Sequence, residues 1–358
     1  MVGVPRSAAA GTKDDRELRR IGRRDLLHGL ALAGAGLPLL ALAGCAGAVP
    51  RAQAEPVGTP TASGSPVAAS LATGPRPSGD FEIPGKIAYV KAGDILAWSA
   101  GKSRQVTRGN AYQGPAWSSD GTRLAASFMG ENHSEIVILT EEGQKVRQVT
   151  HNFSNISISD QSWGRKPVWS PDDLQIAYVS DQGPIDMSLF IVDVDGTGQH
   201  RVVTQKLYSG GLDWPTWSKD GIRIAYTEFD SGMAQIQVCN LSTDTWKTLT
   251  EHVEGCYAPD YSPDGQHIAY TVREKGKHEI YVMDADGANP AKLTEGGMNT
   301  TPVWSPDGQL ISYLASSNDC FDIMVMKVDV TGTPIASVPK AITHGEYVES
   351  PSGLSWTR

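Results

Sequence analysis

Short apolar segments separated by polar turns recur in a fixed order along residues 86–358. A Pro-x-aromatic-Ser segment is followed by an Asp-Gly turn, and then by an apolar run such as Gln175–Val179 or His267–Thr271. Asp-Gly pairs are typical of tight hairpin turns, because glycine readily adopts the positive φ that such turns require. The pattern therefore predicts a long series of β-hairpins.

The repeat can be aligned on its aromatic residue, which stands at positions 117, 169, 217, 261, 304 and 356. The period is 43 to 52 residues, which is typical of four-stranded propeller blades. In each period we expect a third strand such as Glu279–Met283, an Asp-x-Asp-Gly turn, and a short fourth strand that ends in Val-Thr or Leu-Thr at 150, 204, 250 and 294. Such strands are apolar on both sides because each blade packs between two neighbours.

The two ends of this region complement each other. It begins at Lys86–Val90, a second-strand sequence, and ends at Leu354–Thr357, an innermost-strand sequence. We expect three strands from the front and one from the back to complete one blade, so that no sheet edge stays free. The predicted fold class is all-β, a six-bladed β-propeller of four-stranded blades. An open or seven-bladed ring is the alternative.

Three motifs resemble the TolB-like propeller repeat: Pro-Val-Trp-Ser-Pro-Asp-Gly at 302–308, Ile-Tyr-Val-Met-Asp-Ala-Asp-Gly at 280–287 and Lys-Leu-Thr at 292–294. The resemblance covers about residues 86–358. It implies the architecture and not an activity, since similar blades occur in periplasmic TolB, in prolyl oligopeptidases and in many bacterial surface proteins. TolB carries an α/β domain ahead of its propeller and binds the peptidoglycan-associated lipoprotein, whereas here that stretch has the sequence of a leader and a linker.

The first 44 residues have the composition of an export signal. Arginine pairs at 19–20 and 23–24 precede Leu26–Gly44, which contains no Asp, Glu, Lys or Arg and is rich in Leu, Ala and Gly. A basic segment, an apolar segment and small residues at a cleavage site are the parts of such a signal. The residues Gly22–His28 resemble a twin-arginine export motif.

The sequence Leu-Ala-Gly-Cys at 42–45 resembles the lipobox of bacterial lipoproteins. The resemblance implies that Cys45 becomes the lipidated first residue and fixes the chain to a membrane. A transmembrane anchor is the alternative, although Pro38 and several glycines make a poor membrane-spanning helix. Residues 45–85 are dominated by Ala, Pro, Gly, Ser and Thr. They predict a disordered tether that reaches roughly 35 Å.

Charge and cysteine content exclude several classes of function. The net charge is −9, and the predicted leader carries more basic than acidic residues, so the remainder is more acidic still. Neither nucleic acid nor an anionic membrane surface is attracted to such a body. Apart from Cys45, the cysteines stand at 239, 256 and 320 without Cys-x-x-Cys spacing, so neither a disulfide framework nor a zinc site is predicted.

The loops that lead into the innermost strands should surround the mouth of the central channel. Five of these six loops carry an aromatic residue. The candidate ligand-binding residues are Tyr112, Trp163, Trp214, Tyr257, Asn299 (beside Met298) and Tyr347. They predict an aromatic pocket that stacks on a sugar or grips a peptide. The alternative is that the same side chains fill the channel or pack between blades.

No catalytic, metal or cofactor site is predicted. The histidines at 151, 252 and 344 recur with the repeat and stand too far apart for one metal ion, and the Asp-x-Asp-Gly turns lack the further oxygens of a calcium loop. No Gly-x-Ser-x-Gly, His-Glu-x-x-His or phosphate-loop motif occurs. Two long loops, 150–166 and 343–352, are either functional or disordered.

These features predict an extracytoplasmic, lipid-anchored and monomeric propeller that works as a non-catalytic binding or scaffold module. The expected partner is a protein or peptide segment, or a cell-wall glycan. The alternative is an extracytoplasmic hydrolase or lyase acting on carbohydrate or peptide, with a histidine and acidic residues drawn from Asp213, Glu254, Asp260, Glu346 and Glu349.

Overall fold

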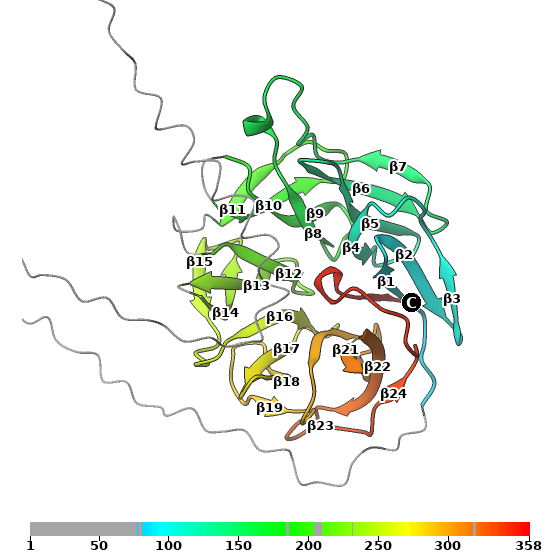
Figure 1. Cartoon of the computed structure of the whole chain (residues 1–358). Helices are drawn as coiled ribbons and strands as arrows, with labels where there is room; N and C mark the ends of the chain where they lie inside the picture. The colour runs from blue at the N-terminus through cyan, green and yellow to red at the C-terminus, as the bar shows by residue number, and fades with distance from the viewer. Residues whose placement is uncertain (1–76, 78–80, 184–185, 204–209, 231, 318–319) are drawn as a thin grey trace, which may run out of the picture. The chain divides into compact units, whose positions relative to one another are not determined.

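The computed structural model describes residues 77, 81–183, 186–203, 210–230, 232–317 and 320–358. The predicted export signal, Cys45 and most of the predicted tether lie outside these residues. The described part forms six antiparallel sheets arranged around a central axis (Figure 1). No helix within it is both long and apolar enough to cross a membrane.

Each sheet runs from an innermost strand at the axis to an outermost strand at the rim. In that order the first blade contains β25 (Ser355–Thr357), β1 (Lys86–Lys91), β2 (Asp94–Ser99) and β3 (Lys102–Gln105). The second contains β4 (Tyr112–Trp117), β5 (Arg123–Met129), β6 (Ser134–Thr140) and β7 (Lys145–Gln148). The third contains β8 (Gly164–Trp169), β9 (Gln175–Ser180), β10 (Ser188–Asp193) and β11 (His200–Val203).

The other three blades follow the same plan. The fourth contains β12 (Leu212–Trp217), β13 (Arg223–Asp230), β14 (Met233–Asn240) and β15 (Thr245–Thr248). The fifth contains β16 (Cys256–Tyr261), β17 (His267–Glu274), β18 (Lys277–Asp284) and β19 (Ala291–Lys292). The sixth contains β20 (Asn299–Trp304), β21 (Leu310–Ser317) and β22 (Cys320–Asp329), which pairs with both β23 (Ile335–Ala336) and β24 (Lys340–Ala341).

The predicted six blades and their closure are confirmed. Strand β25 pairs antiparallel with β1, with Ile87 opposite Trp356. The indole Nε1 of Trp356 donates to the carbonyl of Pro84 over 2.8 Å, and Thr357 donates to the carbonyl of Ser118 in the second blade. The last strand therefore binds the first blade and its neighbour together.

The hydrophobic core consists of six clusters, each formed where two blades meet. Between the second and third blades, for example, Ile136 and Ile138 pack against Trp169, Ile176 and other side chains of the third. The indole of Trp169 also donates to the carbonyl of Ala116 in the second blade, over 2.9 Å. The aromatic residue of each repeat is thus a wedge between blades, which explains its regular spacing.

The Ser-x-Asp-Gly part of the motif closes the hairpin between the first two strands of a blade. In the second blade the Ser118 hydroxyl donates to Asp120 over 2.6 Å and accepts from the Arg123 amide. The Asp120 carboxylate also accepts from the Thr122 amide, and these hydrogen bonds lower its pKa to about 2. The glycine of this turn, Gly121, has φ 68°, as the Asp-Gly prediction requires.

A second set of hydrogen bonds, which we call the threonine device, joins the third strand of a blade to the loop after the fourth. The sequence pattern did not predict it. The threonines predicted to end the fourth strands lie beyond them, and Thr204 is outside the described residues. In the fifth blade the Thr294 hydroxyl accepts from the Ile280 amide and donates to the carboxylate of Glu279. Four further blades repeat the arrangement with Thr107, Thr150, Thr250 and Thr343, paired with Asp94, Glu135, Gln235 and Asp322.

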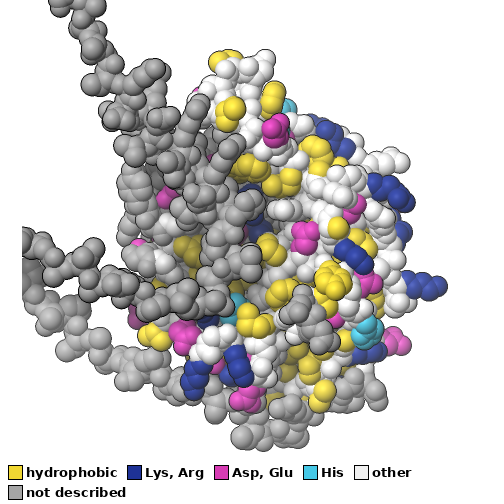
Figure 2. Space-filling model, in the orientation of Figure 1, with side chains coloured by type: hydrophobic (Ala, Val, Ile, Leu, Met, Phe, Trp, Pro, Cys, Tyr) yellow, Lys and Arg dark blue, Asp and Glu magenta, His cyan; other side chains and the backbone are white. Residues whose placement is uncertain are grey.

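The outermost strands carry basic residues although the chain is acidic. These residues are Lys102 and Arg104 on β3, Lys145 and Arg147 on β7, Arg201 on β11, Lys247 on β15, Lys292 on β19 and Lys340 on β24. Figure 2 shows basic side chains along the rim beside β3 and β7. Such charges discourage the exposed strand edges from pairing with other chains.

The two ends of the propeller axis present different loops. We call the end with the inter-blade loops and the turns between second and third strands the top face, and the end with the Ser-x-Asp-Gly turns the bottom face. Strand β1 begins at the bottom face, because Lys86 pairs with Thr357 and its ammonium group donates to the carbonyl of Gly121. Residues ahead of β1 therefore join the propeller at the bottom face.

The buried carboxylate of Glu279 gives a direct test of the threonine device. It accepts from Thr294, from the amides of Gly296 and Gly297 and from Asn299. We expect Glu279→Ala to lower the free energy of unfolding by about 3 kcal/mol or more, because several buried donors lose their acceptor. The Glu279→Gln change should cost about 1 kcal/mol or less, since Gln235 fills the equivalent place in the fourth blade. Urea unfolding of both variants measures the difference, and equal losses would contradict the assignment.

Candidate functional site

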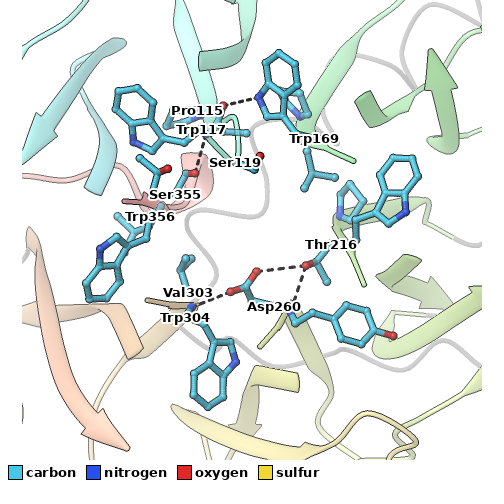
Figure 3. Close-up of a pocket in the computed structure, with 18 of the residues that line it drawn as sticks. Pro115, Trp117, Ser119, Trp169, Thr216, Asp260, Val303, Trp304, Ser355 and Trp356 are labelled. Carbon is cyan, nitrogen blue, oxygen red and sulfur yellow. Dashed lines mark hydrogen bonds between the residues drawn. The ribbon is translucent and has the colours of Figure 1, made fainter. Parts of the chain in front are cut away.

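The six innermost strands enclose a central channel with a cavity of about 600 Å³ (Figure 3). The residue directly before the aromatic of each motif lines this cavity. These residues are Ala116, Val168, Thr216, Asp260, Val303 and Ser355. Figure 3 shows the tryptophan rings of the motif turned away from the axis, so the channel wall is built from the smaller side chains.

Three polar residues of the channel wall bind the neighbouring blade. Ser355 accepts from the amide of Trp117 over 2.9 Å, Thr216 accepts from the amide of Tyr261, and Asp260 accepts from the amide of Trp304 over 2.8 Å. The Thr216 hydroxyl also donates to Asp260. Removal from bulk water raises the pKa of Asp260 to about 7 and outweighs these hydrogen bonds, which lower it. This carboxyl is therefore a structural link across three blades.

Five of the six innermost strands have a β-bulge at the residue before the motif proline, visible as a shift in register with the second strand. The residue before the proline has positive φ in five blades: Gly114, Lys166, Trp214, Ala258 and Thr301. A left-handed conformation costs about 1 kcal/mol or more for a residue with a side chain, and a residue before proline normally adopts extended geometry. The ring geometry imposes the bulge, and all five of these residues border the channel.

Lys166 holds the C-terminal segment over the top mouth of the channel. Its ammonium group donates to the carbonyl of Pro351 and lies 3.0 Å from the ring centroid of Trp214. Burial lowers the pKa of Lys166 to about 7, and the nearby carboxylate of Asp213 opposes that shift. Gly353 lies directly against the Trp214 ring, where a Cβ atom would come within 2.6 Å of it.

The rest of the 343–354 segment is fixed by contacts with the first blade. Glu346 forms an ion pair with Lys91 at 2.7 Å, and the Glu349 carboxylate accepts from the Gly93 amide at the same distance. The short 3-10 turn η3 (Ser350–Ser352) then reaches the mouth of the channel, where Ser352 is buried. Figure 1 shows this red segment extending from the rim toward the axis. Of the two readings of this long loop, the structure therefore shows a defined cover and not a disordered segment.

Three of the six candidate residues pack within a blade or against its neighbour and not around the channel. Tyr112 packs edge-on against Phe128 with ring centroids 5.2 Å apart. Tyr257 packs against His278 at 5.4 Å, and Asn299 is buried and donates to Glu279 over 3.1 Å. None of the three lines the channel cavity.

The other three lie at the top face but do not form one pocket. Trp214 borders the channel, Trp163 is half-buried with its amide bonded to Asp181, and Tyr347 is 67% exposed on the covering segment. The six residues stand at different distances from the motif proline, so the bulge aims them in different directions. Lys166 was missed, and its position directly before a motif proline is the signal that could have found it.

The acidic residues considered for catalysis have separate structural roles. Glu254 accepts from the amide of Lys275, and Asp213 accepts from the amide of Trp214. Glu346, Glu349 and Asp260 have the partners given above. Across the ranges that the structure describes, no three His, Cys, Asp or Glu side chains are grouped so as to hold a metal ion. Cys239 and Cys256 are buried free thiols, and Cys320 is also buried.

Blade number, closure and the channel define a six-bladed β-propeller, and the comparisons with known proteins agree. The family model of the TolB β-propeller domain matches residues 185–352. The Tol-Pal system proteins TolB of Bordetella pertussis and Bordetella parapertussis are each 31% identical over 207 residues, which is 57% of this chain and 45% of theirs. The chain thus spans about half the length of the curated relatives it matches.

Solved structures show the same fold. A TolB from Acinetobacter baumannii superimposes with a TM-score of 0.62 at 18% identity, over 76% of this chain and 67% of that one. A protein described as a putative TolB from Agrobacterium tumefaciens gives 0.59 at 20% identity, over 76% and 92%. Residues 86–358 therefore carry a TolB-like six-bladed propeller.

The two titrating residues of the channel should give stability profiles of opposite sign. The Lys166 pKa of the folded chain is lowered from 10.5 to about 7, so between these values the folded chain binds fewer protons and stability should rise with pH. The Asp260 pKa is raised from 3.8 to about 7, so stability should fall as pH rises across that window. Urea unfolding from pH 4 to 10 should show each slope reduced in Lys166→Met and Asp260→Asn respectively. Profiles parallel to the wild type would contradict both assignments.

Lys166 should also control how firmly the C-terminal segment covers the channel. In Lys166→Met we expect backbone amides of residues 349–353 to exchange with deuterium at least about tenfold faster at pH 6. The substitution removes the ammonium group that contacts Pro351 and Trp214. Hydrogen exchange read by mass spectrometry measures this, with residues 280–283 of β18 as an internal control. Unchanged exchange at 349–353 would show that the contacts with the first blade alone hold the segment.

Proposed function

We propose that the chain is a non-catalytic, extracytoplasmic module that binds a protein of the cell envelope at the top face of its propeller. The observation that carries the proposal is the difference between the top-face side chains. The carboxylates of Glu254 and Glu349 accept from main-chain amides there and Glu346 pairs with Lys91. Large apolar side chains are exposed on the same face: Val253 is 76% exposed, Tyr347 67% and Met298 38%.

Tyr347, Trp163 and Trp214 are the proposed contact residues among the six candidates. Exposed or half-buried aromatic side chains favour binding, because they give a large contact area at a small entropic cost. Tyr112, Tyr257 and Asn299 have structural roles in the blades instead. The relatives named Tol-Pal system protein TolB support a role in the cell envelope.

The proposed anchor and the proposed binding face are at opposite ends of the propeller axis. Lipid on Cys45 is the proposed membrane anchor, and the residues ahead of β1 meet the propeller at the bottom face. A chain anchored in this way leaves its top face free of the tether. A free top face suits a partner that is not part of the anchoring membrane.

Photo-crosslinking in intact cells tests the proposal. Full-length chain carrying p-benzoylphenylalanine in place of Tyr347 should give a discrete protein adduct, and Trp246, which is 52% exposed on the outer strand β15, is the matched control position. Trp163→Ser should lower the adduct yield at 347 at least about tenfold, since it removes a large apolar contact. Its melting temperature should stay within a few degrees of wild type.

An equal yield at both probe positions, or no adduct at either, would contradict the proposed protein-binding face. Adducts that contain only glycan would show that the partner is a cell-wall polymer and not a protein. Turnover of wall fragments or peptides by the purified chain, abolished in a variant of Glu254 or Glu346, would establish the enzymatic alternative instead.

A further inference from the structure

One loop of the top face projects three apolar side chains into solvent. It runs from His151 to Gln161, between β7 and β8, and we call Phe153, Ile156 and Ile158 its apolar tip. Their exposed fractions are 59%, 88% and 69%. Figure 1 shows the loop standing away from the blades. No other described segment of this length exposes three large apolar side chains.

The base of this loop is built from buried, fully bonded groups. The carboxylate of Glu135, which is 3% exposed, accepts from the amides of Asn152 and Phe153. The Asn152 side chain donates to the carbonyl of Ser134 over 2.7 Å, and the Ser162 amide closes the loop onto the Asn152 carbonyl. Both ends of the loop are therefore fixed to the second blade.

The tip itself is also held by short-range hydrogen bonds. The Ser154 hydroxyl accepts from the amide of Ile156, and Gln161 donates to the Ser154 carbonyl over 2.8 Å. Ser157 accepts from the amide of Ser159 and so caps the single turn η2 (Ile158–Asp160). The three apolar side chains are thus presented by a pre-shaped loop, and binding through them loses little conformational entropy.

The charge around the tip decides between two kinds of surface it could meet. Residues 149–164 contain no Lys or Arg, and their one acidic residue is Asp160; the next charged residue along the chain is Arg165. The exposed Glu131 lies two residues from His133, whose ring packs against Phe153. Loops that insert into anionic bilayers carry basic residues beside their apolar ones, and the whole chain has a net charge of −9. An anionic lipid surface would repel this loop.

We propose that the apolar tip inserts into an apolar groove of a protein partner, and that the rim of this groove is basic. The proposal rests on the proposed function, since the groove belongs to the partner bound at the top face. Phe153 enters as the largest contact, steadied by His133, whose ring centroid is 5.1 Å away. The two isoleucines extend the contact, and the partner's basic rim meets Asp160 and Glu131.

The test uses the full-length chain in its own membrane with p-benzoylphenylalanine in place of Ile156. The control probe replaces Leu174, which is 62% exposed in a turn of the bottom face. We expect a protein adduct at 156 and none of the same mass at 174. Mass spectrometry should place the crosslink in an apolar segment of the partner that is flanked by Lys or Arg.

The yield of the adduct at 156 should fall at least about tenfold in Phe153→Ser/Ile158→Ser, because both changes remove buried apolar contact. It should also fall when salt is raised from 50 to 500 mM.

Each other outcome overturns the inference. An adduct with lipid alone shows that the tip meets a membrane, and a crosslink to an acidic or polar segment, or a yield unchanged in the double variant, shows that the tip is not the contact. The probe at Tyr347 separates the two levels of the proposal. A protein adduct at 347 without one at 156 leaves the binding face standing and removes the tip from it, whereas no adduct at either position removes both. The circular dichroism of the double variant should match wild type, because all its changes are in exposed side chains.

Discussion

The whole ring depends on the pairing of the last strand with the first. Strand β25 contributes only three residues, but each of them binds a different part of the structure. Ser355 binds the second blade, Trp356 packs in the core between the sixth and first blades, and Thr357 reaches the turn after β4. Each blade buries both of its faces against neighbouring blades. If the first blade lost its innermost strand, the apolar cores on both sides of it would be exposed to water. The order of all six inter-blade cores therefore rests on a contact such as that of Ile87 with Trp356, which are 269 positions apart in the chain.

Much of this architecture could be predicted from the sequence, because the repeat encodes it locally. An aromatic residue every 43 to 52 residues, tryptophan in all blades but the fifth, marks each inter-blade wedge, and each Asp-Gly pair marks a turn with positive φ. The threonine device was not predicted in the same way. Thr294 and Glu279 are 15 residues apart and have no local signature until strand pairing brings them together, so the threonine was assigned to a strand that ends before it.

The candidate site was harder to predict for a geometric reason. Aromatic residues were counted in the loops before each proline without regard to their distance from it, but the bulge at the proline decides which side chain reaches the channel. Trp214 stands directly before its proline and borders the cavity, whereas Tyr112 stands three positions earlier and packs on Phe128. The direction of a side chain in a twisted and bulged strand cannot be predicted from composition alone.

The entry of the chain into β1, beside the closing strand, also has a mechanical consequence. A partner held at the top face and an anchor joined at Gly85 would pull the propeller in opposite directions along its axis. That tension runs along β1, which is held on one side by β25 and on the other by β2. The hydrogen bonds of both pairs would then be loaded together in shear instead of being opened one after another from an end. If the tether is anchored as proposed, the strand that receives it is the one whose two neighbours share the force.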